Sequence, residues 1–157
     1  MTSSITAVRN KFLSESECDF LVSYFEKHNS GEKWGDTYLL PMNKTSPLHF
    51  KKSQIRDYYL KTIAKDFPLK LNYDQIVKWP NKSFKNLHRD GIVAKENHWT
   101  SVCYLNDDFQ GGETLLDNNM VPIQKGKLVV FNSRFIPHGV NEVLGTRYTY
   151  IAWWQEI

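Results

Sequence analysis

The sequence predicts a mainly β domain of the sandwich or jelly-roll type, with helices packed against the outside of one sheet. Two observations support this fold class. The first 70 residues contain two stretches with the apolar spacing of amphipathic helices, whereas the chain from Leu71 onward is a series of short β-like runs separated by turn residues. With 157 residues, 41% of them hydrophobic, the chain suits a single domain (residues 1–157), helical over about 1–70 and with a strand core over about 71–157.

A capping box, which is a serine N-cap with a glutamate three residues later, marks the start of the first helix. Ser14 and Glu17 have this spacing, so each side chain is expected to accept a hydrogen bond from the other residue's backbone N–H. Apolar residues then recur at helical spacing until residues 28–31, which indicate the end of the helix. The residues of this apolar stripe are Cys18, Leu21, Val22 and Phe25.

A second helix is predicted over residues 53–66 by another apolar stripe at helical spacing. Its members are Ile55, Tyr59 and Ile63. Pro68 lies just beyond the predicted end, which is a common position for proline after a helix. The segment between the two helices, residues 32–50, has no clear periodicity, and we expect it to be an ordered loop with some extended structure.

Six strands are predicted after Leu71 from short runs rich in β-branched and aromatic residues. They cover residues 73–79, 83–90, 99–106, 113–116, 127–132 and 147–154. Turn sequences such as Pro80-Asn81, Gly111-Gly112 and Leu144-Gly145 separate them. Many short strands at close spacing, without internal repeats, favour a sandwich or jelly roll over a parallel α/β fold.

The bulk composition excludes several classes of protein. The formal net charge of +3 is mild and no block of Lys and Arg forms a phosphate-binding stripe, so nucleic acid is not an expected partner. Cys18 and Cys103 are too few for a disulfide framework. Residues 1–4 lack the features of a secretory signal, and no apolar run approaches the roughly 18 residues of a membrane span. We therefore expect a cytoplasmic protein with no membrane partner, monomeric by default.

Three residues form the most informative chemical pattern. Residues i and i+2 of a strand point to the same face, so His88 and Asp90 are expected to bind one ion together. His138, from a distant segment, completes a set of two histidines and one carboxylate, which is typical of non-haem Fe(II) oxygenases. A His-x-Asp pattern alone is common, and the alternatives are a satisfied core histidine for His88 and a turn residue for Asp90.

Arg147, at the start of the last predicted strand, indicates an anion site. Alternation places Arg147, Thr149, Ile151 and Trp153 on one face of that strand, and Tyr148, Tyr150, Ala152 and Trp154 on the other. A buried guanidinium is costly unless it is paired, and its planar fork suits a carboxylate. A bound carboxylate is therefore one interpretation, and an internal salt bridge to Glu142 or Asp117 is the alternative.

The motifs of the chain, taken in order, resemble those of 2-oxoglutarate- and Fe(II)-dependent dioxygenases, above all the prolyl 4-hydroxylase-like branch. They are residues 75–79, His88-Arg89-Asp90-Gly91, residues 100–106, Gly111-Gly112-Glu113-Thr114, residues 122–131, His138 and Gly145-Thr146-Arg147-Tyr148. The resemblance covers roughly residues 71–154. It implies a double-stranded β-helix, a cupin-like jelly roll, with the N-terminal helices packed on one sheet.

Roles for individual residues follow from the same resemblance. It implies Fe(II) ligation by His88, Asp90 and His138, and it implies that Arg147 binds the distal carboxylate of 2-oxoglutarate. Tyr104 matches a tyrosine that hydrogen-bonds this co-substrate. Trp79 stands where many relatives have a tyrosine, and Thr149 stands where some have a serine or threonine beside the arginine. Dioxygen is the further co-substrate, and ascorbate is a candidate reductant.

The activity implied is hydroxylation of a C–H bond, most simply that of a peptidyl proline, with release of succinate and CO2. A free amino acid or another small molecule is the alternative substrate. An AlkB-like oxidative demethylase of nucleic acid is a rival reading, but its second arginine is replaced here by Trp153. A non-catalytic cupin-like binding module is the other rival. The residues expected to face a substrate are Arg89, Lys95, Asn97, His98, Asn132, Arg134 and the segments 34–50 and 91–98.

Overall fold

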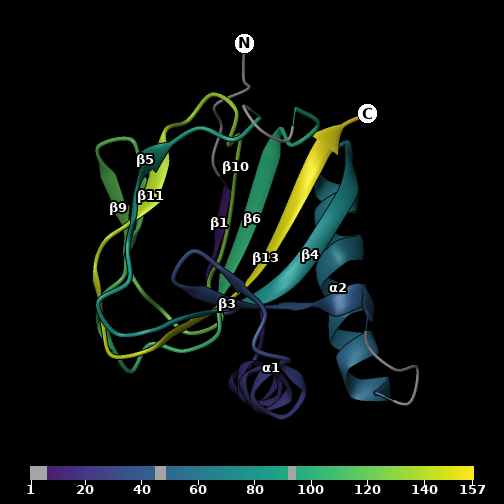
Figure 1. The fold of residues 1–157 in the computed structure, drawn as a ribbon. Helices are drawn as coiled ribbons and strands as arrows, with labels where there is room; N and C mark the ends of the chain where they lie inside the picture. Colours follow the sequence, from purple (N-terminus) through teal and green to yellow (C-terminus); the bar gives the residue numbers. More distant parts are fainter. Residues whose placement is uncertain (1–6, 45–48, 92–94) are drawn as a thin grey trace.

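Two antiparallel sheets lie face to face, and two helices cover the outer face of the larger sheet (Figure 1). A computed structural model describes residues 7–44, 49–91 and 95–157. The larger sheet has the strand order β1 (Ala7–Arg9), β10 (Leu128–Phe131), β6 (Trp99–Tyr104), β13 (Arg147–Glu156), β4 (Leu69–Trp79), β3 (Thr37–Pro41), β2 (Lys33–Trp34). The smaller sheet has the order β5 (Lys85–His88), β11 (His138–Val140), β8 (Thr114–Leu116), β9 (Asn119–Val121). A short pair, β12 (Val143–Leu144) with β7 (Gln110–Gly111), completes the strands of the described residues, and the whole confirms the predicted mainly β fold with helices on one sheet.

The helices begin and end close to where the sequence predicts. In α1 (Glu15–His28) the capping box is confirmed, because Ser14 Oγ accepts from the Glu17 N–H at 3.1 Å and Glu17 Oε1 accepts from the Ser14 N–H at 2.8 Å. The second helix, α2 (Phe50–Asp66), begins three residues before the predicted start and follows a short 3-10 turn, η1 (Met42–Lys44). Its predicted stripe, Ile55, Tyr59 and Ile63, is buried. Neither helix of the described chain is long and apolar enough to cross a membrane.

The six predicted strands all form, with shifted ends, as β4, β5, β6, β8, β10 and β13. The expectation that the first 70 residues are helical is incomplete, because β1, β2 and β3 add to the two edges of the larger sheet. Of these, β2 and β3 confirm the extended structure expected within residues 32–50. The strands without a sequence prediction are β1, β7, β9, β11 and β12, which are two or three residues long and too short to show an alternation of apolar and polar residues. Among them is β11, which carries His138.

Strand β13 separates two apolar cores. It pairs with β4 on one side and β6 on the other, and its side chains alternate as predicted. Tyr150, Ala152 and Trp154 pack under the helices. Ile151 and Trp153 pack on the opposite face, in the interior between the two sheets. Arg147 and Thr149 belong by alternation to this interior face, so the sheet itself directs both polar side chains into the space between the sheets.

A buried carboxylate fixes α2 to the larger sheet. Asp74 on β4 is 2% exposed, and it accepts hydrogen bonds from Arg56 Nε at 2.8 Å and Arg56 Nη2 at 2.9 Å. The Tyr150 hydroxyl donates a third, at 2.6 Å, and the Tyr150 ring stacks on Tyr59 of α2 at 4.0 Å. The helix is thereby held against β4 and β13, the strands that also carry Trp79 and Arg147.

Replacing Asp74 with alanine is expected to lower the free energy of unfolding by about 2–4 kcal/mol, because Arg56 and the Tyr150 hydroxyl lose their buried acceptor. Urea denaturation followed by circular dichroism measures the change. Asp57→Ala is the matched control, since the Asp57 side chain is 68% exposed and meets Lys61 only at 3.8 Å, a surface pair that contributes about 0.5 kcal/mol or less. Equal effects of the two substitutions would show that Asp74 has no special role.

Candidate functional site

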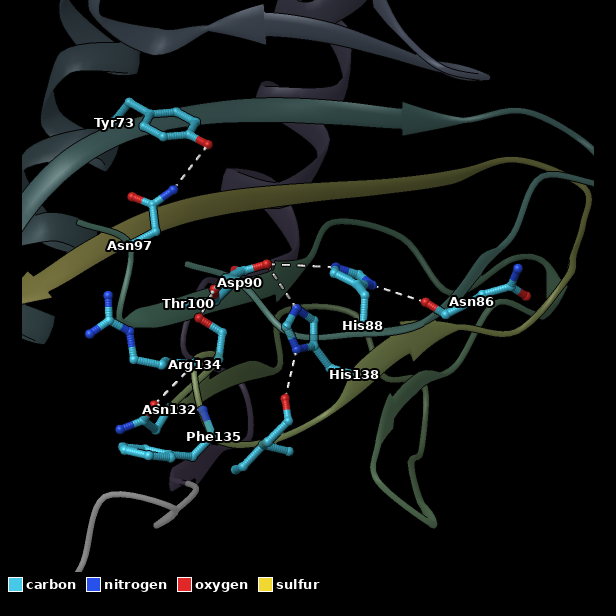
Figure 2. Close-up of polar contacts among 12 residues, drawn as sticks. Tyr73, Asn86, His88, Asp90, Asn97, Thr100, Asn132, Arg134, Phe135 and His138 are labelled. Atoms are coloured by element: carbon cyan, nitrogen blue, oxygen red, sulfur yellow. Dashed lines mark hydrogen bonds and ion pairs between the residues drawn. The ribbon is translucent and has the colours of Figure 1, made fainter. Parts of the chain in front are cut away.

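Two histidines and one aspartate lie close together where β5 ends beside strand β11 (Figure 2). His88 ends β5 and is the register partner of His138 on β11, so the strand pairing itself places the two imidazoles side by side. Asp90 Oδ1 lies 3.6 Å from His88 Nε2 and 3.3 Å from His138 Nε2. One ligand atom from each residue lies within 4.8 Å of the others, close enough for all three to hold one metal ion.

Both imidazoles are oriented with Nε2 toward the aspartate. His88 Nδ1 lies 2.9 Å from the Asn86 carbonyl oxygen, and His138 Nδ1 lies 2.9 Å from the Ile136 carbonyl oxygen. A carbonyl can only accept, so each Nδ1 carries a proton, and Nε2 is the nitrogen that faces Asp90: it donates to the carboxylate when protonated and can bind a metal when deprotonated. This arrangement of a histidine held through its second nitrogen is usual around protein-bound metals.

Asp90 reaches the histidines by a route that the sequence pattern did not predict. The pattern placed Asp90 on the strand of His88, but β5 ends at His88 and Asp90 lies in the bend that follows. Gly91 comes next with φ +89°, and a Cβ there would meet Arg134 Nε at 3.1 Å and the Asn97 carbonyl oxygen at 3.3 Å, so the bend requires glycine.

The Asp90 carboxyl is held in its anionic form. Burial by itself would raise its pKa, but hydrogen bonds from His138 and His88, with a further one from Thr100, outweigh burial and hold the pKa well below its usual range. The group is therefore a carboxylate at neutral pH, as a metal ligand must be.

A buried cation lies on the same interior. Arg147 is 1% exposed, and its guanidinium lies over the rings of Trp79 at 4.9 Å and Tyr104 at 5.3 Å. Its Nη2 donates to Thr114 Oγ1 at 3.0 Å, and the Tyr104 hydroxyl also bonds that oxygen, at 2.6 Å. Burial lowers the pKa of Arg147, although the neighbouring Tyr104 opposes the shift. Among the described residues it forms no ion pair, so the predicted alternative of a salt bridge to Glu142 or Asp117 is not found.

Several buried donors around Arg147 have no acceptor within the described chain. They are Arg147 Nε, Arg147 Nη1, Trp79 Nε1 and Thr149 Oγ1. Register pairing brings their residues together, because Arg147 is opposite Trp79 on β4 and Thr149 is opposite Tyr104 on β6. Buried polar groups are normally hydrogen-bonded, so four orphaned donors around one guanidinium fit a bound carboxylate.

The donor sets also fit the two groups that the sequence resemblance implies. Two imidazole nitrogens and one carboxylate on one side of a metal, with other positions left open, are the ligands that suit Fe(II) in oxygenases. The orphaned donors beside Arg147 suit the distal carboxylate of 2-oxoglutarate. The predicted residues Tyr104, Trp79 and Thr149 all lie at this second location.

The residues expected to face a substrate have different surroundings. Arg89 is exposed beside the histidines, and Arg134 donates to the Lys95 carbonyl oxygen across the bend at Gly91. Asn97 and Asn132 are buried and support loops rather than line an opening. His98 Nδ1 accepts from the Glu156 N–H. Residues 45–48 and 92–94, parts of the predicted segments 34–50 and 91–98, lie outside the described residues.

The sequence pattern predicts no role for three residues that bond the metal-ligand cluster or Arg147: Thr100, Thr114 and Ser133. Thr114 bonds both Arg147 and Tyr104. Thr100 Oγ1 donates to Asp90 Oδ2 at 3.0 Å. No local pattern marks these hydroxyls, because their partners come from segments that only the fold brings together.

Comparison with known proteins agrees with this arrangement. A family model described as the 2OG-Fe(II) oxygenase superfamily matches residues 71–155. No curated protein matches the sequence.

Three solved structures illustrate the similarity of the fold. A prolyl 4-hydroxylase from Pseudomonas putida superposes with a TM-score of 0.79 at 17% identity, over 99% of this chain and 95% of that one. A Trichoplax adhaerens prolyl hydroxylase, in complex with a hypoxia inducible factor peptide fragment, gives 0.77 at 17% identity, over 96% and 83%. HygX from Streptomyces hygroscopicus, with nickel, 2-oxoglutarate and hygromycin B bound, gives 0.75 at 15% identity, over 98% and 84%. At these identities the similarity shows the fold.

Replacing Arg147 with methionine is expected to leave the free energy of unfolding of the ligand-free protein unchanged or to raise it by about 1–4 kcal/mol. The reason is that a buried guanidinium with two unpaired nitrogens costs desolvation that a methionine side chain of similar size does not. Chemical denaturation without added ligands measures the change. Arg56→Met is the matched control and is expected to destabilise, since Arg56 is paired with Asp74. Strong destabilisation by Arg147→Met would mean that Arg147 stabilises the ligand-free fold, and it would contradict the assignment of Arg147 to anion binding.

Proposed function

Because the chain belongs to the 2OG-Fe(II) oxygenase superfamily, we propose that it hydroxylates a peptidyl proline and releases succinate and CO2. The observation that supports this proposal is that two sites lie on one interior: a cluster of two histidines and an aspartate, and a buried arginine with donors that have no acceptor among the described residues. Each site has the chemistry of one of the two groups after which the superfamily is named.

In the proposed mechanism His88, Asp90 and His138 would hold iron(II). Iron(II) bound there would let dioxygen hydroxylate a C–H bond while 2-oxoglutarate is oxidised to succinate and CO2 in the same turnover. The carbonyl groups of Asn86 and Ile136 keep both Nδ1 protons away from the metal, so that each Nε2 stays available as a ligand. Asp90 contributes the single negative charge of the ligand set.

Arg147 would bind and orient the co-substrate. Its Nε and Nη1 have no partner in the described chain and would donate to the distal carboxylate, with Trp79 Nε1 and Thr149 Oγ1 as neighbouring donors. Tyr104 packs on the guanidinium and, through Thr114, holds it in place. Because the guanidinium is buried, water competes little for the carboxylate, and fixing one end of a small molecule in this way lowers the entropic part of the barrier.

An aromatic ledge formed by Tyr73 and Trp153 favours a proline ring as the group to be oxidised. The two rings stack at 4.5 Å with an interplanar angle of 19°, and Tyr73 is 43% exposed. Trp153 is opposite Thr100 on β6, and Thr100 bonds Asp90, so the ledge adjoins the proposed metal ligands. A flat, partly exposed aromatic surface packs well against the saturated ring of proline. Similarity in fold to prolyl hydroxylases, one of them with a peptide fragment, is consistent with a peptide substrate.

An intact-mass screen tests the substrate class. The protein with Fe(II), 2-oxoglutarate and ascorbate is incubated with proline-containing peptides, with matched peptides in which alanine replaces proline, with free amino acids and with an aminoglycoside. Addition of one oxygen to the proline peptides alone, dependent on 2-oxoglutarate and equal to the succinate formed, is expected. Oxidation of a small molecule instead, with no proline peptide modified, would refute the peptidyl-proline assignment and leave the oxygenase assignment in place.

A pair of variants separates the roles of the two sites. Arg147→Met is expected to raise the 2-oxoglutarate concentration required for half-maximal succinate formation by about two orders of magnitude, because a buried charge partner is lost. Its Co(II) affinity, measured by titration, is expected to stay that of the wild type. His138→Ala is expected to lose Co(II) binding while keeping the wild-type circular dichroism spectrum.

Arg9→Met is the control for loss of a positive charge, since Arg9 is half-exposed and its contacts, with Asp66 at 3.5 Å and the Phe12 ring at 5.0 Å, lie outside both sites. If Arg147→Met lost Co(II) as completely as His138→Ala, the two sites would not be separable and the assignment of Arg147 to the co-substrate would be wrong.

A further inference from the structure

Asp90 lies outside the paired strands, whereas both histidines are fixed by the pairing of β5 with β11. Something other than sheet pairing must therefore set the orientation of its carboxylate. Two contacts do so. The Asp90 backbone N–H donates to the Ser133 carbonyl oxygen at 2.9 Å. Asp90 Oδ2 accepts from Thr100 Oγ1 at 3.0 Å (Figure 2).

The two carboxylate oxygens of Asp90 have different surroundings. Oδ1 lies near both imidazoles, 3.6 Å from His88 Nε2 and 3.3 Å from His138 Nε2. Oδ2 is turned to the Thr100 hydroxyl. The hydrogen bond to Oδ2 thus leaves Oδ1 as the oxygen presented with the two Nε2 atoms.

Thr100 is itself rigidly placed. It is 4% exposed and lies on β6, paired with Phe131 on β10 and with Trp153 on β13, in the middle of the larger sheet. Its Oγ1 is also 2.7 Å from Ser133 Oγ, and Ser133 is fully buried. A hydroxyl has only one proton, so Ser133 gives its proton to Thr100 when Thr100 gives its own to Asp90. The two hydroxyls form a chain that ends on Oδ2.

We propose that Thr100, supported by Ser133, is a positioning residue that keeps Asp90 a one-oxygen metal ligand. With Oδ2 bound to Thr100, a second oxygen of the same carboxylate stays off the metal, and the positions opposite the ligand set remain free for the co-substrates. The inference rests on the proposed function, since it concerns the same metal site. Ligating carboxylates are commonly hydrogen-bonded by such outer groups, and loss of one lowers metal affinity about 10–100-fold.

Three variants test this role. Thr100→Val removes the hydroxyl and keeps the shape of the side chain, Thr100→Ser restores the hydroxyl, and Ser133→Ala removes only its support. Co(II) titration of the purified protein, followed by visible absorption, gives the affinity and reports a change of ligand geometry without turnover. Thr100→Val is expected to weaken Co(II) binding about 10–100-fold and to alter the spectrum, Ser133→Ala to do so less, and Thr100→Ser to recover most of the wild-type affinity and spectrum.

Ser101→Ala is the matched control. Ser101 is the next residue of the same strand and is also fully buried, but its hydroxyl lies on the opposite face, where Tyr59 and Trp154 bond it. It is expected to lower the thermal midpoint and leave the Co(II) affinity and spectrum unchanged.

The possible outcomes are separable. Wild-type Co(II) affinity and spectrum in Thr100→Val would overturn the inference and leave the proposed function standing. Failure of Thr100→Ser to recover what Thr100→Val loses would also overturn it, because the effect would then come from packing. If Thr100→Val does not fold, a wild-type Co(II) spectrum in Ser133→Ala overturns the inference and a shifted one supports it. A wild-type protein that binds no Co(II) would remove the inference together with the proposed function.

Discussion

Strand β13 is buried on both faces, and the alternation of its side chains decides which residues pack under the helices and which lie in the interior between the two sheets. On one face Tyr150, Ala152 and Trp154 are sealed under the helices. On the other, Arg147 and Thr149 precede Ile151 and Trp153 in the interior. A shift of one residue in its pairing with β4 and β6 would exchange the faces, placing the guanidinium under α2 and the tyrosines between the sheets. The pairing along ten residues of β13 therefore fixes the site as well as the fold.

Two arginines, one buried and one partly buried, differ in whether an acidic side chain neutralises their charge. Arg56 is partly exposed and fully paired with Asp74, and this pair holds a helix in place. Arg147 is more deeply buried, yet only its Nη2 has a partner among the described residues, a hydroxyl oxygen, and two aromatic faces offer the remaining compensation. The first arrangement contributes to stability and the second is costly without a ligand. A buried charge without an ionic partner is destabilising, and such groups are common at functional sites. The lack of an ionic partner among the described residues therefore distinguishes Arg147 from Arg56.

The sequence could predict those features that depend on local spacing. The Ser14–Glu17 capping box, the stripe of α2 and the alternation along β13 each follow from a short-range rule, and the structure has all three. The route by which Asp90 reaches the histidines could not be predicted in this way, because β5 ends at His88 and a bend around Gly91, closed by contacts with Arg134 and Asn97, replaces the strand. The hydroxyls of Thr100 and Ser133 are also beyond sequence patterns, since residues 33 apart meet only through the pairing of β6 with β10. Strand β11 is too short to have a period at all.

The exposure of the site residues indicates the order in which the co-substrate and the substrate bind in the proposed reaction. The side chain of His88 is 37% exposed, that of Asp90 15% and that of His138 10%, while Arg147 is 1% exposed. Under the proposed function, a co-substrate held by Arg147 would reach the deepest part of the interior, whereas a substrate at the half-exposed Tyr73 would bind at the surface. A peptide lying on the ledge of Tyr73 and Trp153 would cover the approach beside Asp90, because Trp153 and Asp90 are both neighbours of Thr100. Under the proposed function, 2-oxoglutarate has to bind before the peptide. The hydroxyl chain of Thr100 and Ser133 supplies a restraint to Asp90, the one residue of the three that strand pairing does not hold.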